Sequence, residues 1–184
     1  MRYRTATLAL ALLAARMAAA QPVAFDFERG AKGWVGLYDA PKVATHDAKQ
    51  GRACFVLKTD GAVNREYHSP LFPIDSKTRY RVSAWVKVER FDQGYSPLTI
   101  NIRWYFEPRE TCSFGGWNVF RVLPDAKPRT FGWRRIERIV EPHKFKRMVR
   151  PITHARIQIR NYRTSGAAYV DDIRIEPLPK EASK

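Results

Sequence analysis

The stretch YRVSAWVKVER, residues 80–90, alternates between apolar and polar side chains almost without exception. Its even-numbered positions are Tyr, Val, Ala, Val and Val, and its odd-numbered positions up to 89 are Arg, Ser, Trp, Lys and Glu. Because successive side chains of a strand point to opposite faces, this pattern predicts a half-buried antiparallel strand. Trp85 is the exception on the polar face. It is expected either to pack under a second layer or to contact a ligand.

Two further stretches alternate in the same way, TINIRWYFE at residues 99–107 and HARIQIRNY at residues 154–162. One face of each is apolar and is predicted to lie in the core, with Ile100, Ile102, Trp104, Phe106, Ala155, Ile157 and Ile159. The opposite faces mix aromatic rings with Arg, Asn and Gln, with Thr99, Asn101, Arg103, Tyr105, Glu107, Arg156, Gln158, Arg160 and Tyr162. Lys and Glu would dominate an ordinary solvated sheet face, so this mixture indicates a recognition surface.

The rest of the chain consists of short runs rich in Val, Ile, Phe, Tyr and Trp, separated by Gly, Pro, Asp and Ser. We predict nine strands, at residues 23–28, 52–59, 64–69, 78–88, 98–106, 117–122, 133–140, 153–162 and 168–176. Most of the twelve prolines fall outside these runs, as expected because proline cannot donate to a central ladder. The pattern predicts an all-β fold, an antiparallel sandwich or jelly roll of two sheets.

Residues 1–20 have the features of an export signal: basic residues in MRYR, the apolar run LALALLAA, and small residues before Gln21. We therefore expect cleavage near Ala20 and a secreted or periplasmic domain at residues 21–184, without a membrane span. Removing Arg2, Arg4 and Arg16 with the signal lowers the formal net charge from +15 to +12. Such a charge favours an anionic partner, and for an exported protein an acidic polysaccharide or membrane surface is a better candidate than nucleic acid.

Five motifs occur in a characteristic order: FDFERGAKGW (25–34), THDAKQGRACFVLK (45–58), YRVSAWVK (80–87), a Gly-Trp-Arg strand (132–140) closed by Pro142, and AAYVDDIRIE (167–176). In this order the chain resembles the carbohydrate-binding modules of the galactose-binding-like jelly-roll group, families 4, 9 and 22 among them. The resemblance covers nearly all of residues 21–184. It implies a sandwich with one concave sheet that binds sugar and a structural calcium ion on the opposite side.

The resemblance further implies that the polar faces described above join into that concave sheet. The expected ligand-binding residues are Trp85, Asn101, Arg103, Tyr105, Gln158 and Arg160. Aromatic rings offer flat apolar platforms to the C–H faces of a sugar, and Asn, Gln and Arg supply directional hydrogen bonds to hydroxyls or carboxylates. The alternative is that a loop or another domain covers this face, so that Trp85 and Tyr105 serve in packing.

The expected calcium site combines the first and last strands with the loop between residues 45 and 53. Its candidate ligands are Asp26, Glu28, Asp171, Asp172 and backbone carbonyls near Lys49 and Gln50, of which Glu28 and Asp171 best match the family pattern. Calcium takes six to eight oxygen ligands, which such a cluster can supply. The alternative is that Arg29, Arg52 or Arg174 neutralises these acids in ordinary salt bridges.

The two cysteines, Cys54 and Cys112, form either a disulfide, which export permits, or two buried thiols. No Cys or His spacing indicates a zinc site. The basic segment 129–150 is either a solvated strand with a basic loop or a surface that steers an anionic polymer.

The sequence favours a non-catalytic domain that binds a polysaccharide beside a separately encoded carbohydrate-active enzyme, and the net charge favours an acidic polysaccharide. No catalytic motif is present, and Glu107 and Glu110 are a poor glycosidase pair. One alternative is a polysaccharide lyase that uses Tyr105, His143 or His154 as the base and Arg103, Arg160, Asn101 and Gln158 to neutralise a uronate. The other is a structural accessory domain with no glycan ligand.

Overall fold

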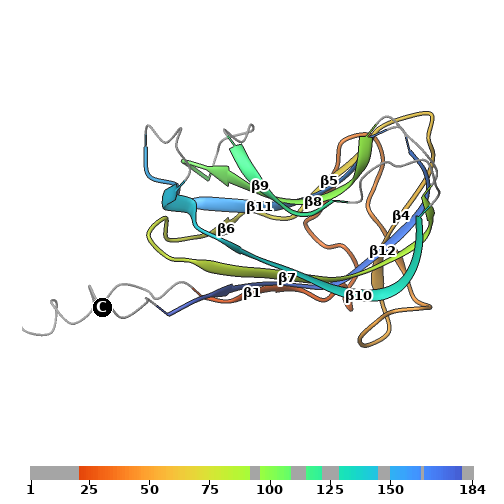
Figure 1. The fold of residues 1–184 in the computed structure, drawn as a ribbon, viewed down its shortest axis with the longest axis horizontal. Helices are drawn as coiled ribbons and strands as arrows, with labels where there is room; N and C mark the ends of the chain where they lie inside the picture. The colour runs from red at the N-terminus through yellow and green to blue at the C-terminus, as the bar shows by residue number, and fades with distance from the viewer. Residues whose placement is uncertain are drawn as a thin grey trace, which may run out of the picture.

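The computed structural model describes residues 21–91, 96–108, 115–121, 129–144, 150–162 and 164–179. These residues form two antiparallel sheets packed face to face (Figure 1). The predicted two-sheet β-sandwich is therefore confirmed. In the described part of the chain no helix is long and apolar enough to cross a membrane.

Sheet A contains six strands, with β10, β7, β12, β4 and β3 in spatial order and β1 beside β12. Their bounds are β1 Val23–Phe25, β3 Lys42–Ala44, β4 Cys54–Asp60, β7 Tyr80–Phe91, β10 Arg129–Val140 and β12 Ser165–Pro177. The central strand β12 pairs with β7 on one side and with both β4 and β1 on the other.

Sheet B also contains six strands, with β2, β5, β11, β8 and β9 in spatial order and β6 beside β11. Their bounds are β2 Val35–Gly36, β5 Arg65–His68, β6 Phe72–Pro73, β8 Ser96–Tyr105, β9 Gly115–Arg121 and β11 His154–Tyr162. Figure 1 shows that this sheet curves away from sheet A at both ends, so that its outer surface is the concave one. A single 3-10 turn, η1 (Pro142–Lys144), follows β10.

All nine predicted strands are present, with ends shifted by a few residues. The short strands β2, β3 and β6, of two or three residues each, were not predicted, because so few residues cannot show an alternating pattern. The core lies between the two inner faces. It buries the predicted apolar positions of β7, β8 and β11, including Val86, Ile102, Trp104 and Ile157, all at 0% exposure.

Candidate functional site

The six residues expected on one concave sheet lie on two different sheets. Trp85 is in β7 of sheet A, whereas Asn101, Arg103 and Tyr105 are in β8 and Gln158 and Arg160 are in β11 of sheet B. Each occupies the outward parity of its strand, so Trp85 and the other five face opposite sides of the sandwich. The expectation of one joint surface is therefore wrong, and only the five residues of sheet B come together.

Trp85 is half-buried on the outer face of sheet A. The ammonium group of Lys49 lies 4.4 Å from the centre of its ring, a cation–π contact that covers the indole with the 45–53 loop. Its other neighbours in the same pocket include Arg135, Asp172 and Glu176. Trp85 therefore packs beneath a loop, as the alternative interpretation of its parity expected.

The outer face of sheet B can be followed strand by strand through its register. Across β11 and β8, Arg156 faces Arg103, Gln158 faces Asn101, and Arg160 faces Thr99. These rows continue on the flanking strands. On β5, His68 faces Gln158 and Glu66 faces Arg160. On β9, Arg121 faces Thr99. At the far edge Val35 of β2 faces His68. Five neighbouring strands thus build one surface, about 19 Å wide at about 4.8 Å per strand.

A chain of side-chain hydrogen bonds crosses the middle of this surface. Asn101 Nδ2 donates to Gln158 Oε1 at 2.9 Å, and Gln158 Nε2 donates to Glu66 Oε1 at 2.8 Å. The same Glu66 oxygen lies 2.6 Å from His68 Nε2. The hydrogen bond from His68 lowers the pKa of Glu66, against the effect of burial, and Gln158 and Arg160 add to the lowering. The network therefore holds an ionised carboxylate and fixed amide groups on the concave face.

Asn101 and Gln158 are each only 6% exposed although they point outward from the sandwich. The amide oxygen of Asn101 has no hydrogen-bond partner, and neither does the Nε atom of Arg156 in the next row. Buried polar groups are normally hydrogen-bonded. The acceptor of Asn101 and the donor of Arg156 can therefore form hydrogen bonds with water or a ligand.

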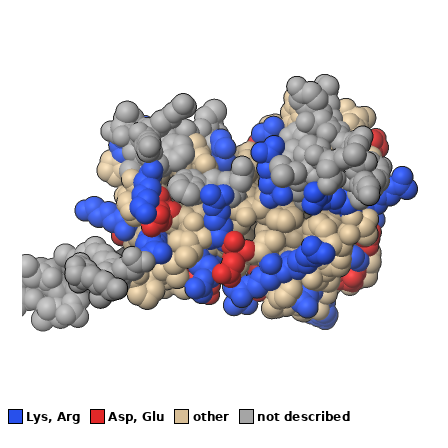
Figure 2. All heavy atoms as spheres, in the orientation of Figure 1, with Lys and Arg blue, Asp and Glu red and all other residues tan. Residues whose placement is uncertain are grey.

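In these rows the described residues include four arginines (Arg103, Arg121, Arg156 and Arg160) and one carboxylate, Glu66. Arg103 and Arg156 stand directly opposite each other on adjacent strands. Like charges in that position destabilise a sheet. By contrast, the lysine at the middle of the outer face of sheet A, Lys87, contacts both Asp47 and Glu89. Figure 2 shows how Lys and Arg outnumber Asp and Glu on one side of the molecule.

Tyr105 does not form the open platform that was expected. It is 1% exposed, and the guanidinium of Arg156 lies 5.6 Å from its ring centre. The half-buried Tyr162 has a similar contact with Arg160 at 5.1 Å. Both rings therefore support arginines on this face, and stacking in this way holds a guanidinium without consuming its hydrogen-bond donors.

Sequence reasoning missed Glu66 and His68 as members of the site. The signal was present in REYH, where Tyr67 takes the inward parity and is 2% exposed, so that the residues on either side point outward. A four-residue strand is too short for this pattern to stand out.

The four candidate calcium ligands with carboxylates do converge. Asp26, Glu28, Asp171 and Asp172 line one pocket with Gln50 and Gly51 of the 45–53 loop. A register shift in β12 between Asp171 and Arg174 makes this possible, because it turns both aspartates toward the loop. Gly51 has a φ of +63°, and a Cβ there would lie 2.3 Å from Glu28 Oε1, so only glycine fits this approach.

The oxygens of this pocket are largely engaged by backbone amides. Asp171 accepts hydrogen bonds from the amides of Lys49, Gln50 and Asp172, and Glu28 Oε1 accepts from those of Arg52 and Ala53. The backbone N–H of Lys49 is thus a donor to Asp171, while the prediction concerned the carbonyl near Lys49. Asp172 is ion-paired with Arg174 at 2.8 Å, the alternative considered from the sequence. Burial raises the pKa of Asp171, although the three amides oppose this.

Among the described residues no three His, Cys, Asp or Glu side chains are placed to hold a metal by themselves. An ion in this pocket would need carbonyl or water ligands as well as the two best-placed carboxylates, Glu28 and Asp171. The carboxylate oxygens of the pocket suit calcium. Arg174 also lines the pocket, and the amide contacts of the carboxylates would have to rearrange to admit an ion.

Cys54 is a free thiol at 0% exposure, which agrees with the alternative of buried thiols and not with a disulfide. It packs with Ala44, Val56 and Tyr169 on the outer side of sheet A. Burial, with smaller effects of Asp171 and Asp47, raises the pKa of the thiol from 9.0 to about 11. Cys112 lies outside the described residues.

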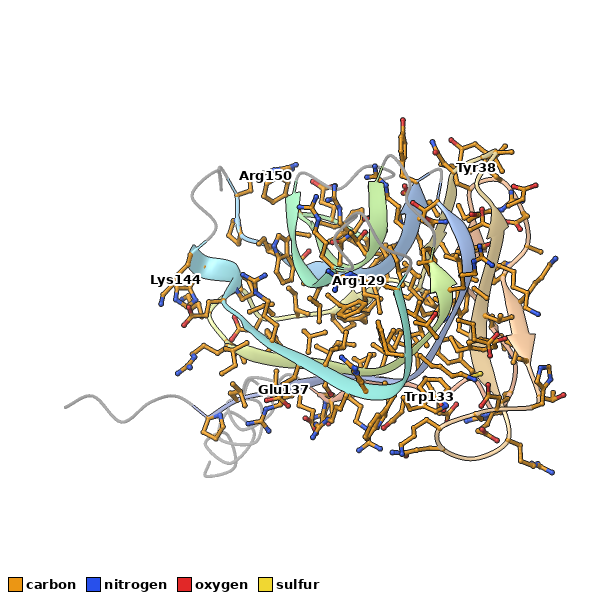
Figure 3. All side chains as sticks on the ribbon, turned by 45° about the vertical axis from the view of Figure 1, so that its right-hand side comes forward. Tyr38, Arg129, Trp133, Glu137, Lys144 and Arg150 are labelled. Atoms are coloured by element: carbon orange, nitrogen blue, oxygen red, sulfur yellow. The ribbon has the colours of Figure 1, made fainter. Side chains whose placement is uncertain are left out.

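The remaining candidates are dispersed. Glu107 forms an ion pair with Arg150 at 2.7 Å, while Glu110 lies outside the described residues. His154 lies on the outer face of sheet B opposite Tyr105, whereas His143 is exposed in η1. In the basic segment, β10 is a largely exposed edge strand. Figure 3 shows two of its side chains, Trp133 and Glu137, on the lower side of the sandwich, away from sheet B.

The sequence matches no protein-family model and no curated protein. Solved structures do match. A CBM22–GH10 xylanase from Clostridium thermocellum, complexed with xylohexaose, has a TM-score of 0.56 at 15% identity, over 85% of this chain and 28% of that chain. This protein thus spans little more than a quarter of that one. A CBM22 xylan-binding domain from Paenibacillus barcinonensis has a TM-score of 0.54 at 13% identity, over 89% and 98% of the two chains.

An adhesin domain of Lys-gingipain from Porphyromonas gingivalis is similar to the same degree. Its TM-score is 0.56 at 14% identity, and the match covers 86% of this chain and 99% of that one. Identities this low establish a shared fold. The chain has the jelly-roll sandwich fold of carbohydrate-binding modules, as the order of its five sequence motifs predicts.

Proposed function

We propose that this protein is a non-catalytic domain that binds an acidic glycan across the concave outer face of sheet B. The observation that carries the proposal is the facing pair Arg103 and Arg156, set among Arg121, Arg160 and the Asn101–Gln158 amides. A carboxylate between two guanidinium groups would turn an unfavourable contact into two charge-assisted ones. Solved structures of the same fold include xylan-binding domains, which supports a polysaccharide as the ligand class.

The distribution of charge supports an acidic rather than a neutral glycan. Among the described residues of the facing rows, four arginines are accompanied by one carboxylate, which already contacts His68 and Gln158. Arginine matches the planar geometry of a carboxylate, and the buried amides fix the orientation of neighbouring hydroxyl groups. The formal net charge, +15 for the full chain and +12 without residues 1–20, would also attract a polyanion from a distance.

The test is affinity electrophoresis and calorimetry against alginate and polygalacturonate, with xylan and β-glucan as neutral polymers. We expect retention by an acidic polymer that weakens as salt is added. Arg160→Ala should weaken it about 10- to 100-fold, the range for losing a hydrogen bond to a charged group. Arg135→Ala is the matched control, because Arg135 is exposed on the outer face of sheet A. Equal losses in both variants, or no retention by any polymer, would contradict the proposal.

A uronate lyase is the second candidate function, and the contact of 2.6 Å between His68 and Glu66 beside Gln158 favours it. A carboxylate that orients a histidine makes it a competent base, and the arginines would neutralise the uronate whose neighbouring proton is removed. Release of unsaturated products from any uronate polymer, followed by their ultraviolet absorbance and lost in His68→Ala, would establish the lyase. The proposed binding domain releases none.

We further propose that the pocket formed by Asp26, Glu28, Asp171 and Asp172 binds calcium as a structural ion. The convergence of four carboxylates, two from the turn after β1 and two from β12, supports it. An ion there would tie the two ends of the domain to the 45–53 loop. Melting curves with calcium and with a chelator test this, and Asp171→Asn should abolish any difference. Identical melting curves with calcium and with chelator for the unaltered protein would mean that the pocket binds no calcium and that its carboxylates only accept hydrogen bonds from backbone amides.

We place the site of action outside the cytoplasm, because residues 1–20 have the pattern of an export signal, although they lie outside the described residues. Fractionation of producing cells, with N-terminal sequencing of the mature protein, should give a chain that starts at Gln21. A separately encoded carbohydrate-active enzyme acting on the same polymer would be a suitable partner.

A further inference from the structure

The concave face ends at an apolar edge that the proposed contacts to an acidic glycan do not use. Among the described residues five large apolar side chains are exposed, and three of them fall within four positions: Val35 at 61%, Leu37 at 61% and Tyr38 at 58%. We call this group the β2 edge. Single exposed apolar residues are normal, but a contiguous group usually marks a contact surface.

The β2 edge is continuous with the arginine-rich face. Val35 pairs with His68, and the Leu37 amide donates to the carbonyl of Glu66 at 2.8 Å. Val35 therefore lies at the end of the row that contains Gln158 and Asn101. Leu37 lies at the end of the neighbouring row, which contains Arg160. A ligand lying across the strands would therefore reach these aliphatic side chains after its acidic groups had met the arginines. Figure 3 shows Tyr38 at the upper margin of the molecule, on the side of sheet B.

The turn that follows β2 holds this edge in place. A Cβ on Gly36 would lie 1.7 Å from the carbonyl oxygen of Asp39, so the turn closes tightly around a glycine. The Asp39 carboxylate accepts a hydrogen bond from the buried Tyr67 hydroxyl at 2.7 Å and pairs with Arg65 at 3.6 Å. Burial and this hydrogen bond raise the pKa of Tyr67, so the phenol remains a donor over the physiological range. Leu37 and Tyr38 are thus held outward, an arrangement that lowers the entropic cost of binding.

The chemistry of the β2 edge indicates what part of a glycan it would contact. Val35 and Leu37 are branched aliphatic side chains two positions apart on one face, about 7 Å from each other. They cannot hydrogen-bond to sugar hydroxyls, and covering hydroxyls with aliphatic surface is unfavourable. A methyl group, by contrast, gains free energy when it leaves water for such a surface.

Resting on the function proposed above, we propose that the β2 edge selects acidic glycans that bear methyl groups next to the charged residue. The methyl group belongs either to an O-acetyl ester or to a 6-deoxy sugar, and both present the same chemistry to Val35 and Leu37. The arginines provide affinity for the charge, and the β2 edge provides the preference among acidic glycans.

The experiment compares three probes of equal length by calorimetry: a bare oligogalacturonate, the same oligomer after chemical O-acetylation, and an alternating rhamnose–galacturonate oligomer. We expect at least one methyl-bearing probe to bind about fourfold tighter than the bare one for each methyl group buried. The probe that shows the gain identifies the source of the methyl group. The double variant Val35→Thr/Leu37→Gln should lose this preference and keep its affinity for the bare oligomer.

Ile139→Thr is the matched control, because Ile139 is 44% exposed on β10 of the other sheet, and it should keep the preference. Equal binding of all three probes, or an equal loss for all three in the double variant, overturns the inference but leaves the acidic-glycan function standing. Binding of none of them overturns both. If the double variant converts a dimer into a monomer by light scattering, the β2 edge contacts a second copy of the chain and the inference is wrong.

Discussion

Arg103 and Arg156 face each other across β8 and β11 in the register of the sheet. A sheet selected only for stability would avoid this pairing. We therefore predict opposite effects of Arg156→Gln on folding and binding. Urea unfolding should show unchanged or slightly higher stability, by up to about 1 kcal/mol.

Binding of Arg156→Gln to an acidic oligomer should fall by about tenfold or more. Arg156→Lys keeps the charge but not the planar guanidinium group, so its affinity should lie between those of the unaltered protein and Arg156→Gln. A stability loss that parallels the loss of binding would mean that Arg156 mainly supports Tyr105 and the sheet.

The Glu66–His68 contact predicts a particular dependence of stability on pH. The pKa of Glu66 is lower in the folded protein, so its contribution to stability is present above the unfolded value of 4.5 and is lost as the pH falls below it. The fall in unfolding free energy from neutral to acidic pH should be smaller in Glu66→Gln than in the unaltered protein. Equal falls in the two proteins would show that the carboxylate is not stabilised by its neighbours.

Cys54 predicts a loss of stability on the alkaline side. The pKa of its thiol is higher in the folded protein, so the contribution is complete below pH 9.0 and is lost as the pH rises through about 11. A shift of this size corresponds to at most about 3 kcal/mol. Cys54→Ala should be less sensitive to pH across this window in urea unfolding.

A thiol reagent provides an independent check on Cys54. Because the side chain is fully buried, Cys54→Ala should not change the amount of reagent consumed by the native protein at pH 8, and should lower it by one equivalent after unfolding. If native Cys54→Ala consumes less reagent than the native unaltered protein, the Cys54 thiol is accessible in the folded state.

Trp85 provides a prediction that separates the two faces of the sandwich. Trp85→Ala removes a half-buried indole and its contact with Lys49, and should cost about 1–3 kcal/mol of stability. Affinity for acidic oligomers should stay within about twofold of the unaltered protein, since the ring lies on the opposite sheet. Complete loss of binding by a folded Trp85→Ala protein would show that the binding site lies on sheet A.

The case of Trp85 shows which information a sequence contains and which it does not. Alternation identifies the two faces of one strand, and on this basis the core positions within β7, β8 and β11 were predicted correctly. Phe106, also predicted for the core, lies just beyond β8 and is only half-buried. Parity does not say which strands share a sheet, because pairing joins segments far apart in the chain. The residues of β8 and β11 belong together because Gln158 pairs with Asn101, 57 positions away, whereas β7 pairs with β10 and β12.

Burial of outward-facing side chains was the second limit of sequence reasoning. Tyr105 has the outward parity that was predicted, yet it is 1% exposed beneath Arg156. What covers a sheet face depends on neighbouring strands and loops, and no local pattern records it. The acidic pocket shows the reverse situation, since matching motifs brought Asp26, Glu28, Asp171 and Asp172 together before any geometry was known.

The position of β12 determines when this domain can fold. Strand β12 lies in the middle of sheet A and pairs with β1, β4 and β7. These earlier strands therefore cannot complete the sheet until β12 has been synthesised. A nascent chain that lacks residues 165–177 has no centre around which sheet A can close. Folding should therefore follow synthesis of β12 and be slow, as is usual when contacts are distant in sequence. The export proposed above would benefit from this delay, because the chain would stay unfolded while it crosses the membrane. A truncation at residue 164 should abolish folding altogether.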